Sequence, residues 1–590
     1  MATAVTGSVS WGITPVGYDS SNLATMSFDY RSNYLMSANG QLRYQVQYQN
    51  ANLNESIEVG YEGGVVNVIF IIETSVNYSD WTLLTKIKKS RDIANRSYIN
   101  QTSPKLHRFT VDISQLVSDE LSYSLCPINK GTWESPFYGG MNGGLTMQDN
   151  VIGGLSPTGS PVSNYNVSEN GTFRHVRVSA QFEVLDSAQS IVTSNTTLNY
   201  APKISVINSV NQFERDVVYY RDNFLYNHQV NTENRPKRFL TRCPNWYWNT
   251  DAGNVSYNKL VGINDQAEFL QWWVRESYPL SDANAATEVY NNIELFGTTF
   301  LADGSVENNF VMVDFNSLLE NAPGADSATQ FNRTQSRMLI QNVSPTYINA
   351  NAKVPQNATR PYTTTISPIT ASTHRYSLYY RGVWYSQDTS SWENEKLGAS
   401  NWYEIDREAA NIPYGYVRFH WLNSMGGIDS YTAKRDITEG LSVERSIVER
   451  KNADRTWYQA NSGAVNNSET AVSNSDYVSD TMRGGDLYKG GREVLGLNAE
   501  KVQSVYTDPL NRSISGWLEE ILLSPNVWIE MDTEATGMGN KRNAHLRPST
   551  KGYIPVIITN SEMEIVNETN GLVQFNIEYT LAHKVKTQRN

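Results

Sequence analysis

The sequence is poor in residues that bind metals or form disulfides. It has two cysteines, Cys126 and Cys243, and seven histidines in 590 residues. The cysteines have no CxxC spacing, and no two histidines stand at ligand spacing on a shared element. We therefore expect no metal site and no disulfide framework. We expect each histidine to be a half-exposed strand residue.

Long apolar runs and catalytic motifs are also lacking. The longest apolar run, VVNVIFIIE at 65–73, is too short to span a bilayer and predicts a buried strand. The N-terminal residues have no basic region followed by an apolar stretch, so we expect no signal peptide. The patterns GxGxxG, HExxH and GxSxG are missing, as is a phosphate-binding GxxxxGK motif. The sequence thus predicts a non-enzymatic protein with no cofactor.

Positive charge is in short supply. The 60 Asp and Glu residues outnumber the 48 Lys and Arg residues, which leaves a formal net charge of -12. This balance argues against a protein that grips nucleic acid through its phosphates. It is compatible with a surface past which DNA slides without sticking.

Aromatic and turn-forming residues are abundant. Aromatics make up 11% of the chain and include 35 tyrosines, whereas helical runs rich in Ala, Leu, Glu and Lys are scarce. Such a composition suits half-buried pleated sheets joined by many turns. We predict a mainly β fold of several tandem antiparallel β-sandwich-like domains with a few short accessory helices.

We expect three domains. An N-terminal β-domain would span 1–205 and a second β-domain 206–370, with a C-terminal β-domain at 371–590. The second domain is predicted as a repeat of the first, because FTVDISQLV at 109–117 is echoed by VMVDFNSLL at 311–319. Chance similarity over nine residues is the alternative.

Individual segments carry further expectations. GTFRHVRVSAQFEVLD at 171–186 alternates with period two and predicts a long strand. The polar segment at 349–373 is the best linker candidate, and 461–480 is expected to form an exposed insertion loop. Asp265 is expected to cap a short helix that carries Phe269, Trp272 and Trp273.

A terminal unit of one helix and several strands is expected after residue 512. In SISGWLEEILLSP, apolar residues recur at helical spacing, with Ser515 as the candidate N-cap and Pro525 as the stop. Strands are predicted in NVWIEMD, GYIPVIIT, EMEIVNE and LVQFNIEYTLAH.

The stretch VRFHWLNSMGGIDSYTA, at 417–433, predicts a β-hairpin. Apolar residues alternate with Arg418 and His420 on the first strand, and Gly426 and Gly427 are expected to turn the corner at positive φ. The structural residues of this hairpin are Trp421, Asn423, Gly426, Gly427, Asp429 and Tyr431. His420 and Asp429 lie on opposite arms of the hairpin with no third catalytic group in the pattern. We therefore interpret them as structural, and we expect Gly427→Val to disturb the hairpin.

The same hairpin carries a family resemblance. Its core contains Trp-Leu-Asn, a short turn and Gly-Gly-apolar-Asp-x-Tyr, and the segment LSVERSIVERK follows it. This arrangement resembles structural proteins of tailed bacteriophages. Further blocks that resemble this group are FTVDISQLV, RHVRVSAQFEVLD, LLSPNVWIE, YIPVIIT and GLVQFNIEYTLAH. The family's Gly-Gly-Asp core corresponds to Gly426, Gly427 and Asp429, and the resemblance brings no catalytic residues with it.

The resemblance implies a non-enzymatic structural subunit of a virion. Such a subunit forms a homo-oligomeric ring or adaptor in the neck, tail or baseplate and contacts other virion proteins. DNA passes through the channel without sequence-specific binding, and no membrane is involved. The expected location is therefore the virion, assembled in the host cytoplasm.

Two alternatives remain open from the residues. The aromatic clusters NWYWN, QWW and VWYS would suit a receptor- or glycan-binding tail or fibre protein if they were exposed. A β-sandwich glycosidase would need two facing carboxylates, which the many acidic residues allow but do not single out.

Overall fold

The protein is mainly β, as predicted. Strands take up 65% and helices 9% of the residues that the computed structural model describes. These residues are 8–13, 34–40, 42–50, 65–75, 81–90, 105–121, 173–185, 191–193, 199–201, 203–210, 239–241, 243, 260–261, 268–274, 292–314, 337–355, 364–386, 391–396, 400–405, 416–450, 491–532, 551–560 and 571–582.

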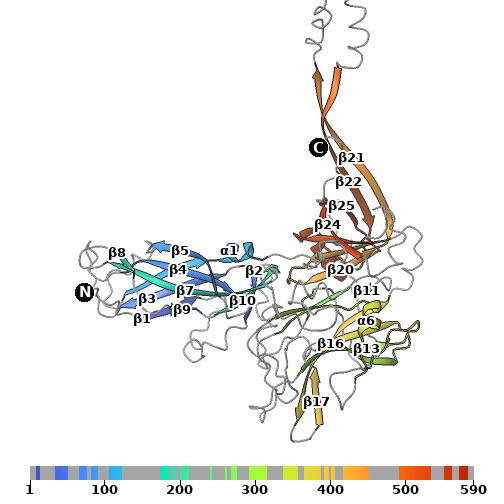
Figure 1. Cartoon of the computed structure of the whole chain (residues 1–590), viewed down its shortest axis with the longest axis horizontal. Helices are drawn as coiled ribbons and strands as arrows, with labels where there is room; N and C mark the ends of the chain where they lie inside the picture. The colour runs from blue at the N-terminus through green and yellow to red at the C-terminus, as the bar shows by residue number, and fades with distance from the viewer. Residues whose placement is uncertain are drawn as a thin grey trace, which may run out of the picture.

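The N-terminal part is a sandwich of two sheets (Figure 1). The smaller sheet has the order β1 (Ser8–Ile13), β3 (Arg43–Asn50), β6 (Lys105–Asp112). The larger has the order β2 (Tyr34–Asn39), β10 (Ile204–Val210), β7 (Phe173–Leu185), β4 (Val65–Ser75), β5 (Thr82–Ser90), with β8 (Ile191–Thr193) and β9 (Asn199–Tyr200) also on β7. Pairing is antiparallel except between β2 and β10.

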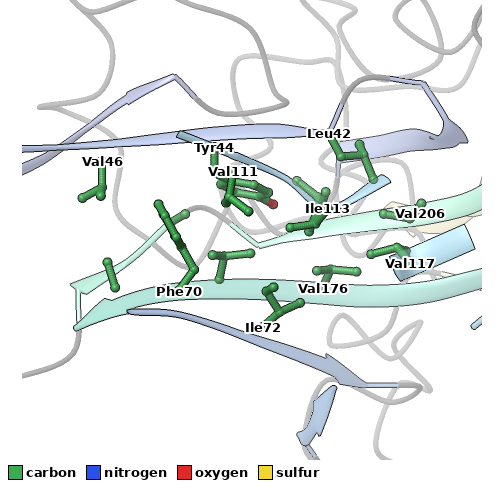
Figure 2. Packing of buried hydrophobic residues seen from close by; sticks show 14 of the residues in the cluster. Leu42, Tyr44, Val46, Phe70, Ile72, Val111, Ile113, Val117, Val176 and Val206 are labelled. Atoms are coloured by element: carbon green, nitrogen blue, oxygen red, sulfur yellow. The ribbon is translucent and has the colours of Figure 1, made fainter. Parts of the chain in front are cut away.

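Alternating apolar residues from both sheets fill this sandwich. Tyr44 and Val111 of the smaller sheet meet Phe70, Ile72 and Val176 of the larger one (Figure 2). Successive residues of a strand point to opposite faces, so period-two patterns place one apolar set in the core. The strands expected at 65–73 and 171–186 are thus confirmed.

A short helix closes one end of the sandwich. The helix α1 (Ser114–Asp119) follows β6 directly and buries Val117 in the core. Asp112 at the end of β6 accepts a hydrogen bond from the Ser114 backbone N–H at 3.0 Å. The segment at 105–119 is thus a strand followed by a short helix. The residues after β14 that would form its echo lie outside the described part of the chain.

A six-stranded sheet is formed by strands from the middle of the sequence. Its order is β11 (Leu260–Val261), β18 (Asn401–Ile405), β16 (Arg375–Ser386), β13 (Asn292–Phe300), β14 (Val306–Asp314), with β17 (Ser391–Lys396) also on β16. This sheet has strands on both sides of the expected boundary at 370/371. Similarly, β10 continues the N-terminal sheet past 205/206. Whether the second domain repeats the first stays a prediction.

The segment at 349–373 is not a free linker in its described residues. After α6 (Pro345–Asn351), the backbone of Lys353 exchanges two hydrogen bonds with Val311 of β14, at 2.8 and 2.9 Å. Ala352 is fully buried. Its polar composition was misleading, because these polar side chains have bonding partners. Asn349 binds both backbone groups of Ile369 within the segment, and the Thr370 and Thr373 hydroxyls donate to Glu307 of β14.

The helix expected after Asp265 is a strand instead. β12 (Phe269–Val274) pairs antiparallel with β15 (Arg337–Asn342) over its whole length. Phe269 and the two tryptophans stand at helical spacing, but aromatic residues also favour strands when a partner strand is available. That partner lies far away in sequence.

The C-terminal part is a seven-stranded sheet covered by two helices. Its order is β20 (Ile428–Ala433), β19 (Val417–Leu422), β23 (Val527–Asp532), β24 (Lys551–Ile558), β25 (Asn576–Leu581), β22 (Gly491–Tyr506), β21 (Arg435–Arg450). The helices are α9 (Arg512–Leu518) and α10 (Glu520–Leu523). Trp517, Leu518 and Ile521 from these helices pack into one core with Phe419 and Trp421.

The predicted terminal helix exists but begins earlier than expected. The Asn511 side chain accepts a hydrogen bond from the Ile514 backbone N–H at 3.1 Å, so Asn511 caps α9. Ser515, the expected cap, lies buried inside the helix. The end is as predicted, because α10 stops at Leu523, two residues before Pro525.

Strands β21 and β22 extend beyond the rest of their sheet (Figure 1). β25 pairs with β22 only over Val502–Tyr506, whereas β21 pairs with β22 along its whole length. We call the two-stranded part, 441–450 with 491–501, the arm. The expected loop at 461–480 and the expected strand at 562–568 lie outside the described residues. None of the described helices is long and apolar enough to cross a membrane.

Candidate functional site

The turn of the predicted hairpin is built around Asn423. Its side-chain oxygen accepts hydrogen bonds from the backbone N–H groups of Met425 and Gly427, both at 2.9 Å. The Asn423 backbone N–H donates to the Gly427 carbonyl at 2.8 Å. β19 and β20 pair in full register on either side, which confirms the hairpin. We call these two strands and their turn the junction hairpin.

The two glycines have different structural roles. Gly426 has a positive φ of +81°, as expected, and a Cβ there would lie 2.9 Å from Ile207 Cδ1. The expectation of positive φ at Gly427 was wrong. A Cβ at Gly427 would lie 2.2 Å from the Leu240 carbonyl oxygen, so close backbone approach requires this glycine.

The tip of the junction hairpin contacts three separate parts of the chain. The Val210 backbone N–H at the end of β10 donates to the Ser424 carbonyl at 2.8 Å. The Asn423 side-chain amide donates to the Leu240 carbonyl at 2.9 Å. The Ser424 hydroxyl donates to Glu520 of α10 at 2.5 Å. The hairpin thus connects the N-terminal sandwich, the segment at Leu240 and the C-terminal helices.

Asp429 is a buried structural acceptor. Its two carboxylate oxygens accept hydrogen bonds from Trp517 Nε1 at 2.7 Å and from the Thr241 hydroxyl at 2.5 Å. The Trp517 ring packs against Trp421, with ring centroids 5.1 Å apart. Charge-assisted hydrogen bonds of this kind fix geometry strongly in a dry interior. Asp429 therefore holds α9 against the hairpin.

Tyr431 extends this bonding toward the chain after β22. Its hydroxyl accepts a hydrogen bond from the Asp508 backbone N–H at 3.2 Å. The six hairpin residues singled out from the sequence are thus brought together on one element. Their contacts join segments of the fold, which is the structural role inferred for them.

His420 bonds to residues other than Asp429. Its Nδ1 lies 2.8 Å from the Ser430 hydroxyl, and its Nε2 lies 3.1 Å from Glu530 Oε2. An ionised Glu530 can only accept, so Nε2 carries the proton and Ser430 donates to Nδ1. Burial lowers the pKa of His420, against an opposing effect of Glu530. His420 is therefore a neutral imidazole near pH 7.

The Ser430–His420–Glu530 array has the residue types of a hydrolase triad but not its exposure. His420 is 0% and Ser430 2% exposed, and the Glu530 side chain is 3% exposed. Ser430 and His420 are directly opposite on paired strands. Phe269 of β12 packs against the His420 ring, with ring centroids 5.4 Å apart, so the face of the sheet that carries the array is covered. We therefore read the array as a buried polar network.

A fully buried ion pair lies beside this array. Arg418 donates to Glu268, which stands at the start of β12, and also to the Thr432 hydroxyl at 3.0 Å. Both charged side chains are 0% exposed. A buried charge needs such a partner, so the pair links β19 to the β12–β15 sheet.

Sequence reasoning missed several of these partners. Glu268, Glu530, Glu520 and Thr241 lie 96 to 188 residues away from the hairpin residues that they contact. The one available signal was Glu530, a carboxylate in the interior of the apolar run VWIEM. The expectation of half-exposed histidines was wrong for His175 and His420, which are both fully buried.

Other candidate sites give little support for a ligand. Among the described residues, no cluster of three His, Cys, Asp or Glu could hold a metal ion. The segment around Asp303 is a turn, with Gly304 at a φ of +87°. Cys243 is buried and forms no disulfide within the described residues. NWYWN and the Trp side chains of QWW and VWYS lie outside the described residues.

No protein-family model matches the chain, and no curated protein matches it.

Proposed function

We propose that this chain is a non-enzymatic structural subunit of a tailed-phage virion. It forms a ring or adaptor in the neck, tail or baseplate through contacts with its own copies and with other virion proteins. The proposal rests on the resemblance of the junction hairpin and the flanking blocks to such proteins.

The arm is the structural observation that favours this function most. It is a two-stranded ribbon that extends past its sheet and exposes Leu441 and Leu495 at 62% and 69%. Isolated two-stranded ribbons are marginally stable in water, and exposed apolar side chains on sheet edges favour association. A subunit that acts inside an assembly has a use for such an element.

The buried polar network supports a structural role over a catalytic one. His420, Ser430 and the Arg418–Glu268 pair are enclosed between the C-terminal sheet and β12. They stiffen a junction and offer no reacting group to solvent. The net charge of -12 suits a wall that DNA passes without adhering.

Locating the chain in particles tests the proposal. A gold-labelled antibody against the chain should mark the neck, tail or baseplate of purified phage particles in electron micrographs. Peptides of the chain should be recovered from the same particles by mass spectrometry. Particles that lack the chain altogether would refute the proposal.

A further inference from the structure

The free edge of β21 is long and regular. β21 ends the strand order of its sheet, and within the described residues no strand pairs with its outer edge. The pairing with β22 shifts between Ser446 and Ile447, and the extra residue, Leu495, belongs to β22. β21 therefore stays regular from Thr438 to Arg450. Unprotected edges of this kind are templates for pairing with another strand.

Exposed apolar residues accompany this edge. Ile447 is 57% and Val448 is 37% exposed, and the bulged Leu495 is 69% exposed. They gather where Ile447 pairs with Val494 beside the bulge. A partner strand at this position would remove apolar surface from water and satisfy edge backbone groups at the same time.

The sequence of this edge is complementary to itself. In ERSIVER, at 444–450, an antiparallel copy centred on Ile447 places Glu444 opposite Arg450 and Arg445 opposite Glu449. Residues directly opposite share a face of the sheet, and pairs of opposite charge there are stabilising. Two-fold symmetry doubles each pair, so this register forms four ion pairs around the apolar centre.

Neighbouring registers are disfavoured. A shift by one residue places Glu444 opposite Glu449, or Arg445 opposite Arg450 in the other direction. A shift by two forms no ion pair within 444–450. Like charges directly opposite are destabilising, so the charge order selects the register centred on Ile447.

We propose that two copies of this chain pair through the edges of β21, antiparallel and with the two-fold axis at Ile447. The contact is isologous, so it joins copies in pairs and does not by itself close a cyclic ring. In an assembly of rings it would link a subunit of one ring to a subunit of another. The inference goes beyond the proposed virion role and does not depend on it.

Charge exchange within the full-length chain tests the proposal. Glu444 and Arg450 lie opposite uncharged residues of β22, Asn498 and Gly491, so changing either one sets no like charges directly opposite each other within the arm. Glu444→Arg and Arg450→Glu each create two like-charge pairs across the dimer. Each should weaken dimerisation roughly tenfold or more in sedimentation equilibrium. The double exchange restores complementary pairs and should recover the wild-type dissociation constant.

A control and a cross-link make the result specific. Glu500→Arg carries the same charge change on β22, away from the proposed edge, and should leave dimerisation unchanged. Ile447→Cys should form a disulfide-linked dimer on mild oxidation, whereas Leu441→Cys should not, because its copy lies far from the axis.

Three outcomes would overturn the pairing. They are a wild-type chain that stays monomeric at high concentration, single exchanges without effect, and a double exchange that fails to recover dimerisation. These failures differ from failure of the virion role. Particles can contain the chain without paired arms, and paired arms can form in a chain that particles lack.

Discussion

At the scale of single residues, the junction hairpin is held by groups that each satisfy a specific buried partner. Gly427 makes room for the Leu240 carbonyl, Asp429 accepts from Trp517 and Thr241, and His420 bridges Ser430 and Glu530. Removing one member leaves its partner buried and unbonded, which costs more than the bond itself contributed.

Gly427 can be tested by adding a single methyl group. Gly427→Ala places Cβ 2.2 Å from the Leu240 oxygen, so the backbones must separate. We expect the free energy of unfolding to fall by about 1–3 kcal/mol, measured in urea. The matched control is Gly516→Ala in α9, where a Cβ meets nothing within 4 Å. That change should stabilise the helix, and equal effects of both substitutions would contradict the close-approach account.

Asp429 offers a second test at this scale. Asp429→Ala leaves the Trp517 indole N–H and the Thr241 hydroxyl without their acceptor. Each unsatisfied buried donor should cost about 1–3 kcal/mol of stability. Thermal unfolding followed by tryptophan fluorescence measures the loss and reports the environment of Trp517. An unchanged melting temperature would show that Asp429 has no structural role.

His420 predicts a pH dependence of stability. Burial lowers its pKa in the folded chain below the value of about 6.5 that the unfolded chain retains. The unfolded state therefore binds this proton first, and the free energy of unfolding should fall as the pH drops below about 6.5. The surrounding charges are Glu530, Arg418 and Glu268.

Replacing His420 separates this effect from the titration of other groups. Between pH 6.5 and 5, the His420→Gln variant should lose less of its free energy of unfolding, measured in urea, than the wild-type chain does. At pH 8 the variant should be less stable than the wild-type chain. His374→Gln, at a half-exposed site, is the matched control for loss of one imidazole. A wild-type pH slope in the His420 variant would exclude His420 as the source.

At the scale of elements, local patterns predicted several strands, and long-range pairing decided the exceptions. β4 follows its apolar run, and β7 and the junction hairpin follow their alternating residues. The local sequence does not identify β12 as a strand, because the spacing of its aromatic residues also fits a helix. Only the pairing of β12 with β15 excludes that helix. The buried partners of the hairpin were equally hidden, since sequence patterns carry no information about which distant carboxylate meets Arg418 or His420.

The start of β21, before the arm, contains a bulge that can be tested. β21 gains an extra residue near Asp436, which has a positive φ of 45°. Asp and Asn tolerate this conformation better than branched residues, and Gly adopts it freely. Asp436→Gly should leave stability unchanged or slightly higher. Asp436→Val should lower the free energy of unfolding by about 1–2 kcal/mol in urea. The reverse order would show that the bulge does not need a left-handed residue.

At the scale of the whole molecule, one hairpin connects parts of the chain that are distant in sequence. The sandwich at Val210, the segment at Leu240 and the helix α10 at Glu520 all bond to the turn between β19 and β20. A chain whose distant parts are bonded to one turn, and which carries a projecting arm, is suited to assembly, where contacts between copies need fixed geometry. This is the physical reason for favouring a structural subunit over an enzyme.

Cryo-electron microscopy of the purified full-length chain shows whether copies assemble through the arm. We expect symmetric particles of several copies, in which the arm lies at contacts between copies and the junction hairpin is buried inside each one. A chain that remains a single copy at every concentration, with the arm surrounded by solvent, would contradict this expectation.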